Sequence, residues 1–106
     1  MQKDDQVQIR IKNVSSFEYS DVRVNTNGGE NNYGNINSNS YSEYESFDFA
    51  YRYAFVELKI GSDTFTIQPI DYVGEDPLKS GKYTYAIDAT EEGGKYERLS
   101  LVLLVD

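Results

Sequence analysis

The sequence predicts an all-β fold: a two-sheet antiparallel β-sandwich with about seven strands. Apolar and polar residues alternate with a period of two in several segments, as in Val7, Ile9 and Ile11. Turn-forming residues separate these segments at short intervals. No apolar stripe with helical spacing continues for ten residues, whereas Tyr, Phe, Val, Thr and Ile are abundant. This combination is typical of a β-sandwich.

The first two strands are predicted by alternation and separated by turn residues. Residues 7–14 alternate strictly, so they form a strand with one buried face and one wet face. Residues 17–26 resume the alternation, but its phase changes at residues 20–21, which indicates a β-bulge or a corner. The polar stretch 25–32 follows, and Asn27-Gly28 within it favours a tight turn.

The middle of the chain is harder to interpret. A short strand is expected over residues 33–36, and a further extended segment over residues 41–49. The facing of the second segment is ambiguous, because Tyr41 and Phe47 share a phase that Tyr44 does not.

The second half predicts a hairpin, a loop and two long strands. Residues 53–60 and 64–68 form a β-hairpin about a short glycine-containing loop. Residues 70–76 lie between two prolines, which favours a loop or an edge. Gly81 opens the next strand. The last segment, residues 96–105, is apolar in both phases, and this predicts a central strand covered on both faces.

The 106-residue chain has the size of a single domain. Residues 1–6 are expected to form a flexible N-terminal tail, and residues 7–106 a single β-sandwich domain. No segment approaches the roughly 20 apolar residues that a membrane-spanning helix needs. We therefore expect no membrane-spanning segment.

The composition excludes several classes of function. The chain has 10 Lys and Arg against 18 Asp and Glu, a net charge of −8, which disfavours nucleic acid and anionic membranes as partners. Cysteine and histidine are absent, so disulfides, thiolate nucleophiles, Ser-His catalysis and the common zinc ligand sets are excluded. Carboxylates are the remaining acid-base material, and they are too numerous for a pair to be informative. We expect a protein that is not an enzyme and needs no cofactor.

One loop collects oxygen ligands that a hard cation such as Ca²⁺ prefers. Asp71, Glu75 and Asp76 lie close together in the sequence, with several backbone carbonyls between them. The spacing of an EF-hand is absent. The alternative interpretation is that Asp76 and Pro77 begin a turn.

Tyrosine is the most unusual feature of the composition, with ten tyrosines, five phenylalanines and no tryptophan. Tyr33, Tyr41 and Tyr44, with the adjacent Glu43, are candidate ligand-binding residues, because a tyrosine ring can stack on a ligand while its hydroxyl stays hydrated. The alternative is that these rings fill the core and pack across strands.

Residues 33–44, with the sequence YGNINSNSYSEY, resemble small, uncharacterised lipoprotein domains exported to the cell envelope of gut-type Bacteroidetes bacteria. The flanks are similar too, with Ile-x-Ile-x-Asn-x-Ser at residues 9–15 and Leu-x-x-Gly-x-Tyr-x-Tyr at residues 78–85. The resemblance implies an immunoglobulin-like sandwich, a trimmed signal segment, and a location in the periplasm or at the cell surface. It also implies a lipid anchor outside these 106 residues, since the lipid-bearing cysteine is missing. It supplies no active-site or ligand residue.

Together these observations favour a non-enzymatic cell-envelope domain that acts as a structural or protein-interaction module. The alternative is a small carbohydrate-binding module that uses exposed tyrosines. The expected partner is therefore an unknown protein or a glycan.

Overall fold

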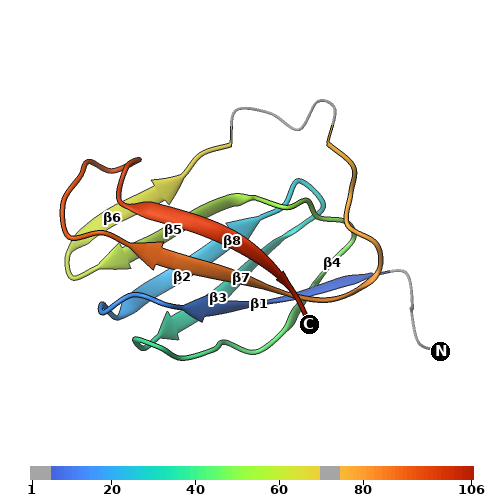
Figure 1. Cartoon of the computed structure of the whole chain (residues 1–106), viewed down its shortest axis with the longest axis horizontal. Helices are drawn as coiled ribbons and strands as arrows, with labels where there is room; N and C mark the ends of the chain where they lie inside the picture. Colours follow the sequence, from blue (N-terminus) through green and yellow to red (C-terminus); the bar gives the residue numbers. More distant parts are fainter. Residues whose placement is uncertain (1–5, 70–74) are drawn as a thin grey trace.

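The computed structural model of the chain describes residues 6–69 and 75–106, and it confirms the predicted two-sheet β-sandwich (Figure 1). The strand order is β4-β1-β7-β8 in the first sheet, here called sheet A, and β3-β2-β5-β6 in the second, sheet B. The strands are β1 (Val7–Asn13), β2 (Tyr19–Asn25), β3 (Glu30–Ile36), β4 (Glu45–Phe47), β5 (Phe55–Ile60), β6 (Asp63–Ile67), β7 (Gly81–Ala89) and β8 (Leu99–Val105). Of the tail expected over residues 1–6, all but Gln6 lies outside the described residues. No helix in the described part of the chain is long and apolar enough to cross a membrane.

The sandwich is not purely antiparallel, because β1 and β7 pair in parallel from Val7 and Gly81 to Asn13 and Ile87. The other ladders between the described strands are antiparallel. A period-two pattern specifies which face of a strand is buried, and it carries no information about the direction of the neighbouring strand. The alternation of apolar and polar residues could therefore not predict that β1 and β7 pair in parallel.

The core lies between the two sheets and is built by alternate residues of the central strands. The strictly alternating β1 buries Val7, Ile9 and Ile11, as the sequence predicts. The other buried apolar residues come from both sheets and the segments beside them: Tyr19, Val22, Val24, Ile36, Phe47, Ala50, Ala54, Val56, Leu58, Phe65, Tyr83, Tyr85, Ile87 and Ala89. Burial of this apolar surface is the main favourable contribution to folding.

A predicted bulge and a predicted hairpin are confirmed. The ladders of β2 with β3 and with β5 both change register after residues 19–20, and Asp21 has a positive φ of 51°. This is the bulge that the phase change at residues 20–21 predicts. The β5–β6 hairpin closes with Ile60 opposite Asp63, and Gly61 supplies the positive φ of 64° that its tight turn requires.

The position predicted for the last strand is wrong. Among residues 6–69 and 75–106, β8 pairs with β7 alone and forms an edge of sheet A (Figure 1). Val102 and Leu104, which share the outer face, are 59% and 45% exposed, and Val105 at the end of the strand is 76% exposed. An apolar pattern on both faces predicts a covered strand only when a second layer lies over each face, and no described segment forms such a layer here.

The side chain of Asn13 is completely buried at the end of β1, and all its hydrogen-bonding groups are satisfied. Its Nδ2 donates to the carbonyls of Phe17, at 2.6 Å, and Ile36, at 3.0 Å. Its Oδ1 accepts from the backbone N–H of Ser15, at 2.9 Å, and from the Ser15 hydroxyl, at 2.7 Å. One side chain thus connects β1, the β1–β2 turn and the end of β3.

The backbone of Asn13 adds a fourth segment to this network. Its N–H donates to the carbonyl of Ser40, at 2.9 Å, and its carbonyl accepts from the N–H of Asn39, at 2.7 Å. The motif at residues 9–15 therefore has a physical role: its isoleucines enter the core, and its Asn and Ser close the hydrogen-bond network.

We predict that Asn13→Ala lowers the free energy of unfolding by about 2 to 4 kcal/mol, because it leaves buried backbone groups without partners. Chemical denaturation followed by circular dichroism measures the change. Asn37→Ala is the matched control, since Asn37 is an exposed asparagine in the same loop region, and it should change stability by less than about 0.5 kcal/mol. Equal effects of the two substitutions would contradict the role assigned to Asn13.

Tyr19 is buried in the core, where its hydroxyl donates to the carbonyl of Ile87 at 2.9 Å. Burial raises the pKa of Tyr19 to about 12. This pKa is higher in the folded than in the unfolded chain. The stability that the buried, neutral Tyr19 hydroxyl gives the folded state is therefore fully present below about pH 10 and is lost as the pH rises through about 12.

We predict that Tyr19→Phe lowers the unfolding free energy by about 1 kcal/mol at neutral pH, through loss of one hydrogen bond. The difference from the wild type should shrink between pH 10 and 12, because only the wild type must ionise or expose Tyr19. Urea unfolding across this pH range tests the prediction, and parallel pH profiles would contradict it.

Candidate functional site

The two outer faces of the sandwich differ in chemistry. On sheet B, exposed charges of opposite sign pair across the strands: Arg23 with Glu57 at 2.6 Å and with Glu30 at 3.7 Å, and Lys59 with Asp21 at 3.6 Å. Such pairs keep a sheet face hydrated and add little stability. The outer face of sheet A instead combines cations, tyrosine rings and aliphatic side chains, which makes it the candidate binding surface.

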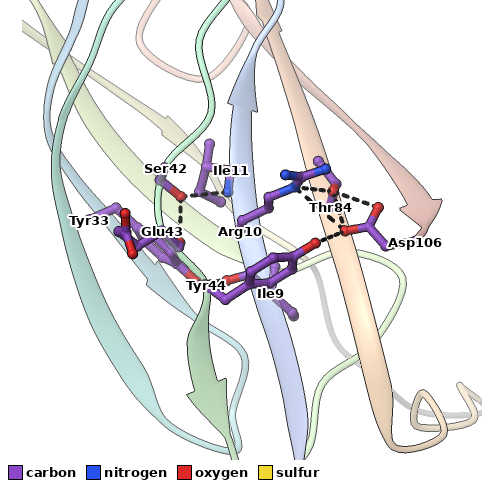
Figure 2. A network of polar contacts seen from close by, with 9 residues as sticks. All are labelled: Ile9, Arg10, Ile11, Tyr33, Ser42, Glu43, Tyr44, Thr84 and Asp106. Atoms are coloured by element: carbon purple, nitrogen blue, oxygen red, sulfur yellow. Dashed lines mark hydrogen bonds and ion pairs between the residues drawn. The ribbon is translucent and has the colours of Figure 1, made fainter.

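We call the centre of this face the sheet A platform, and Figure 2 shows four of its residues, Arg10, Tyr44, Thr84 and Asp106. Its members come from β1, from β7, from the residue that follows β8 and from the segment that precedes β4. They are Arg10, Lys12, Tyr41, Tyr44, Lys82, Thr84 and Asp106.

The segment before β4 follows the edge of β1 in an irregular way. Ser42 donates its backbone N–H to the carbonyl of Ile11 at 2.8 Å, while its hydroxyl accepts from the N–H of Ile11 at 2.8 Å. A side-chain oxygen therefore takes the place of a backbone carbonyl, and the regular alternation is interrupted. As a result Tyr41 and Tyr44 both reach Arg10 on the outer face, while Phe47 is buried. This resolves the ambiguous phase of residues 41–49, of which only Glu45–Phe47 is a regular strand.

Arg10 is the centre of the platform. Its guanidinium carbon lies 3.9 Å from the ring centroid of Tyr41 and 5.1 Å from that of Tyr44, distances typical of cation–π contacts. Its Nε donates to the Thr84 hydroxyl at 3.0 Å and lies 3.5 Å from a carboxylate oxygen of Asp106. These contacts hold the cation and the two rings in a fixed arrangement.

Two lysines extend the same pattern outward. The Nζ of Lys12 lies 5.2 Å from the centroid of the Tyr41 ring, and the Nζ of Lys82 lies 5.1 Å from that of Tyr44. Each tyrosine is thus flanked by Arg10 and by one lysine.

Asp106 binds the hydroxyl group of Tyr44. Its carboxylate accepts from the Tyr44 hydroxyl and, at 2.8 Å, from the Thr84 hydroxyl (Figure 2). Burial raises the pKa of Asp106, but the hydrogen bonds from Tyr44 and Thr84 and the charges of Arg10 and Lys82 outweigh burial and hold it below its usual value. The hydrogen bond to Asp106 raises the pKa of Tyr44. Asp106 therefore remains an anion near neutral pH, with Tyr44 as a neutral donor.

The structure divides the ligand-binding residues predicted from the sequence. Tyr41, which is 50% exposed, and Tyr44 lie together in the platform, and Glu43 between them is exposed. Tyr33, drawn in Figure 2, is packed against the core, and its hydroxyl donates to the carbonyl of Ile9 at 2.7 Å. Burial raises the pKa of Tyr33. Its partner is therefore the β1 backbone.

Sequence analysis missed Arg10, Thr84 and Asp106. Arg10 occupies a polar position of a predicted strand, where a hydrated cation is the simplest interpretation. Thr84 and Asp106 come from distant parts of the chain, and only the pairing of β1 with β7 and of β7 with β8 brings them together. No local pattern signals this arrangement.

Two of the three predicted calcium ligands, Glu75 and Asp76, lie among the described residues. Glu75 pairs with Arg52 at 3.4 Å, and Asp76 is exposed. Asp71 lies outside the described residues. Within residues 6–69 and 75–106, no three or more Asp, Glu, His or Cys side chains gather in a way that could hold a metal ion.

Comparison with known proteins supports the fold. No protein-family model matches the chain, and no curated protein matches it. An NMR structure of a protein from Eubacterium rectale is similar, with a TM-score of 0.60 and 16% sequence identity over 95% of this chain and 88% of that chain. At this level of identity the likeness extends to the fold and not to a function.

We predict that Tyr44→Phe raises the pKa of Asp106, because it removes one of the hydrogen bonds that stabilise the carboxylate. An NMR titration of the Asp106 side-chain carboxyl carbon measures the shift. Tyr41→Phe is the control, since the Tyr41 ring contacts Arg10 and its hydroxyl is not bonded to Asp106. An Asp106 pKa that is identical in wild type and Tyr44→Phe would contradict the described network.

Proposed function

We propose that this domain is a non-enzymatic interaction module that binds a protein partner through the sheet A platform. The observation that carries the proposal is the placement of two surface tyrosine rings around one arginine. Tyrosine and arginine are the residues that most often dominate binding energy at protein interfaces. Because Arg10, Thr84 and Asp106 already restrain the two rings, little conformational entropy is lost when a partner binds.

The surroundings of the platform fit a protein partner. In the β7–β8 ladder Leu104 lies opposite Thr84, and Val102 lies opposite Ala86. Val102 and Leu104 are both exposed, and they extend the surface of the platform across the same face of sheet A. An apolar and aromatic centre with a polar border is the usual composition of a protein interface.

The local charge suggests the chemistry of the partner. The whole chain has a net charge of −8, but the platform contains Arg10, Lys12 and Lys82 against the single carboxylate of Asp106. An acidic protein surface would complement this basic patch and would be steered toward it.

The location of the domain is part of the same proposal. The patterns at residues 9–15 and 78–85 resemble exported Bacteroidetes lipoprotein domains, which supports a site of action in the cell envelope. A lipid anchor would then lie outside these 106 residues. Fractionation of the host cell, followed by immunodetection, tests the location.

The second candidate is a carbohydrate-binding module. The observation that favours it is that the rings of Tyr41 and Tyr44 both lie against Arg10 on the outer face of sheet A, with the exposed Glu43 between them in the sequence. Aromatic rings of this kind can stack on sugars. Tyr33, however, is not part of this surface, so such a site would have two stacking rings instead of three.

The decisive comparison is between a double variant, which carries both Tyr41→Ala and Tyr44→Ala, and the single variant Tyr96→Ala. Tyr96 is a matched control, because it is 62% exposed and its ring also contacts a lysine, Lys95, at 5.6 Å. Partners are cross-linked to the wild-type domain in the host, identified, and titrated against each purified variant. We expect the Tyr41/Tyr44 double variant to bind at least about tenfold more weakly, and Tyr96→Ala to bind like the wild type.

A double variant that is folded and binds with wild-type affinity would contradict the proposal. A glycan array with the wild type, the double variant and Tyr96→Ala tests the second candidate. Saturable glycan binding that is lost only in the double variant would favour the carbohydrate-binding function over the protein-interaction function.

A further inference from the structure

The described part of the sandwich has four edge strands, and β8 differs from the other three. β4 has only three residues. The edge of β6 is covered where the N–H of Thr66 donates to the carbonyl of Lys95 at 2.9 Å. β3 has a register shift against β2 and a positive φ of 71° at Gly34. These are known means of protecting an edge from further pairing.

Within residues 6–69 and 75–106, the β8 edge has none of these protections. It is a regular strand of seven residues, LSLVLLV, without a charge, a proline or a glycine. Its exposed side chains include Val102, Leu104 and Val105. A long, apolar and unprotected edge of this kind is a template for pairing with another strand.

The hydrogen bonds at the two ends of β8 show which of its backbone groups face outward. The N–H of Thr90 donates to the carbonyl of Arg98 at 2.9 Å, and the N–H of Asp106 donates to the carbonyl of Lys82 at 3.1 Å. In an antiparallel ladder, residues two apart direct their backbone groups to the same neighbour. The even-numbered residues of β8 therefore face β7. The residues that direct their N–H and C=O groups to the open edge are Leu99, Leu101, Leu103 and Val105.

We propose that two copies of this chain associate through antiparallel pairing of their β8 strands, with the two-fold axis at Val102. In this register Leu99 lies opposite Val105 of the second copy, and Leu101 lies opposite Leu103. All four outward-facing residues of each strand are then paired, whereas a shift of the register in either direction leaves some of them unpaired. The result is one continuous sheet across both copies.

The side chains and charges fit a second copy. At the axis the two Val102 side chains meet in a non-hydrogen-bonded pair, where side chains are closest. The residues before β8 include Glu91, Glu92 and Glu97 together with Lys95 and Arg98, so that end has a net negative charge. At the other end Arg10 and Lys82 lie beside the single carboxylate side chain of Asp106, so that end has a net positive charge. Antiparallel pairing places the acidic end of one copy near the basic end of the other, although each copy has a net charge of −8.

This association leaves the sheet A platform free. Tyr41 and Tyr44 contact Arg10 on β1, and β7 lies between β1 and β8. A dimer formed at the β8 edge would therefore present two platforms on one extended sheet. Because Tyr41 and Tyr44 are two strands away from the β8 edge, substitutions of these two tyrosines test partner binding without altering the pairing strand.

The absence of cysteine from the sequence allows a direct test. Val102→Cys introduces a single thiol at the proposed axis, where Cα atoms of a non-hydrogen-bonded pair are about 4.5 Å apart and within reach of a disulfide. Ser46→Cys is the control, because Ser46 is exposed on β4, at the opposite edge of sheet A. Under mild oxidation we expect the Val102 variant to form a disulfide-linked dimer at least about tenfold faster. Equal rates for the two variants would overturn the proposal.

Sedimentation equilibrium gives a second, independent measurement. The wild type should show a concentration-dependent dimer, and Val102→Lys should be monomeric, because two like charges would meet at the axis. Asn32→Lys, on the exposed edge strand of sheet B, should dimerise like the wild type. Circular dichroism confirms that each variant is folded.

In the sedimentation experiment, two results would overturn the proposal: a wild type that remains monomeric at millimolar concentration, or a dimer that persists unchanged in Val102→Lys. Neither result would affect the protein-binding role of the platform, which depends on Tyr41 and Tyr44. Loss of partner binding in the Tyr41/Tyr44 double variant, with dimerisation intact, separates the two surfaces.

Discussion

The buried carboxamide of Asn13 is the interaction on which most of this structure depends. Its two donors and its acceptor oxygen join β1, the β1–β2 turn and the end of β3, and its backbone joins the loop that leads to β4. A buried amide is costly unless every group is paired, so a network that satisfies all of them selects one arrangement of these segments. The loop it holds continues through Ser42 to the two tyrosines of the platform. The position of the candidate site therefore rests on the same network as the fold.

The chemistry of the outer faces follows from the two-layer architecture. Each sheet of a sandwich has one face covered by the other sheet, and its second face must be compatible with water. Sheet B meets this requirement with cross-strand ion pairs. Sheet A has Val102 and Leu104 on its uncovered face and two tyrosines beside Arg10. Because a strand with two apolar faces cannot be covered within a two-layer domain, its surplus apolar surface is available for association.

The platform is organised by charge as well as by stacking. Asp106 accepts hydrogen bonds from Tyr44 and Thr84 and lies beside the Arg10 cation, so two strands, β1 and β7, and the segments next to β4 and β8 contribute to one fixed group. Arg10 is oriented by an anion on one side and by tyrosine faces on the other. A surface restrained in this way before binding loses less entropy on association than flexible side chains would.

The sequence by itself determined the all-β class, the bulge at residues 20–21, the β5–β6 hairpin and the buried face of β1, because alternation and turn chemistry are local properties. It also restricted the chemistry, since the chain contains neither cysteine nor histidine. Only the tertiary structure decided that β1 and β7 pair in parallel, that β8 is an edge, and that Tyr33 supports the core while Tyr41 and Tyr44 lie outside. The reason is that a local pattern specifies the face to which a side chain points. The strand that lies beside it, and the distant Thr84 and Asp106 that meet Arg10, depend on contacts between residues far apart in the chain.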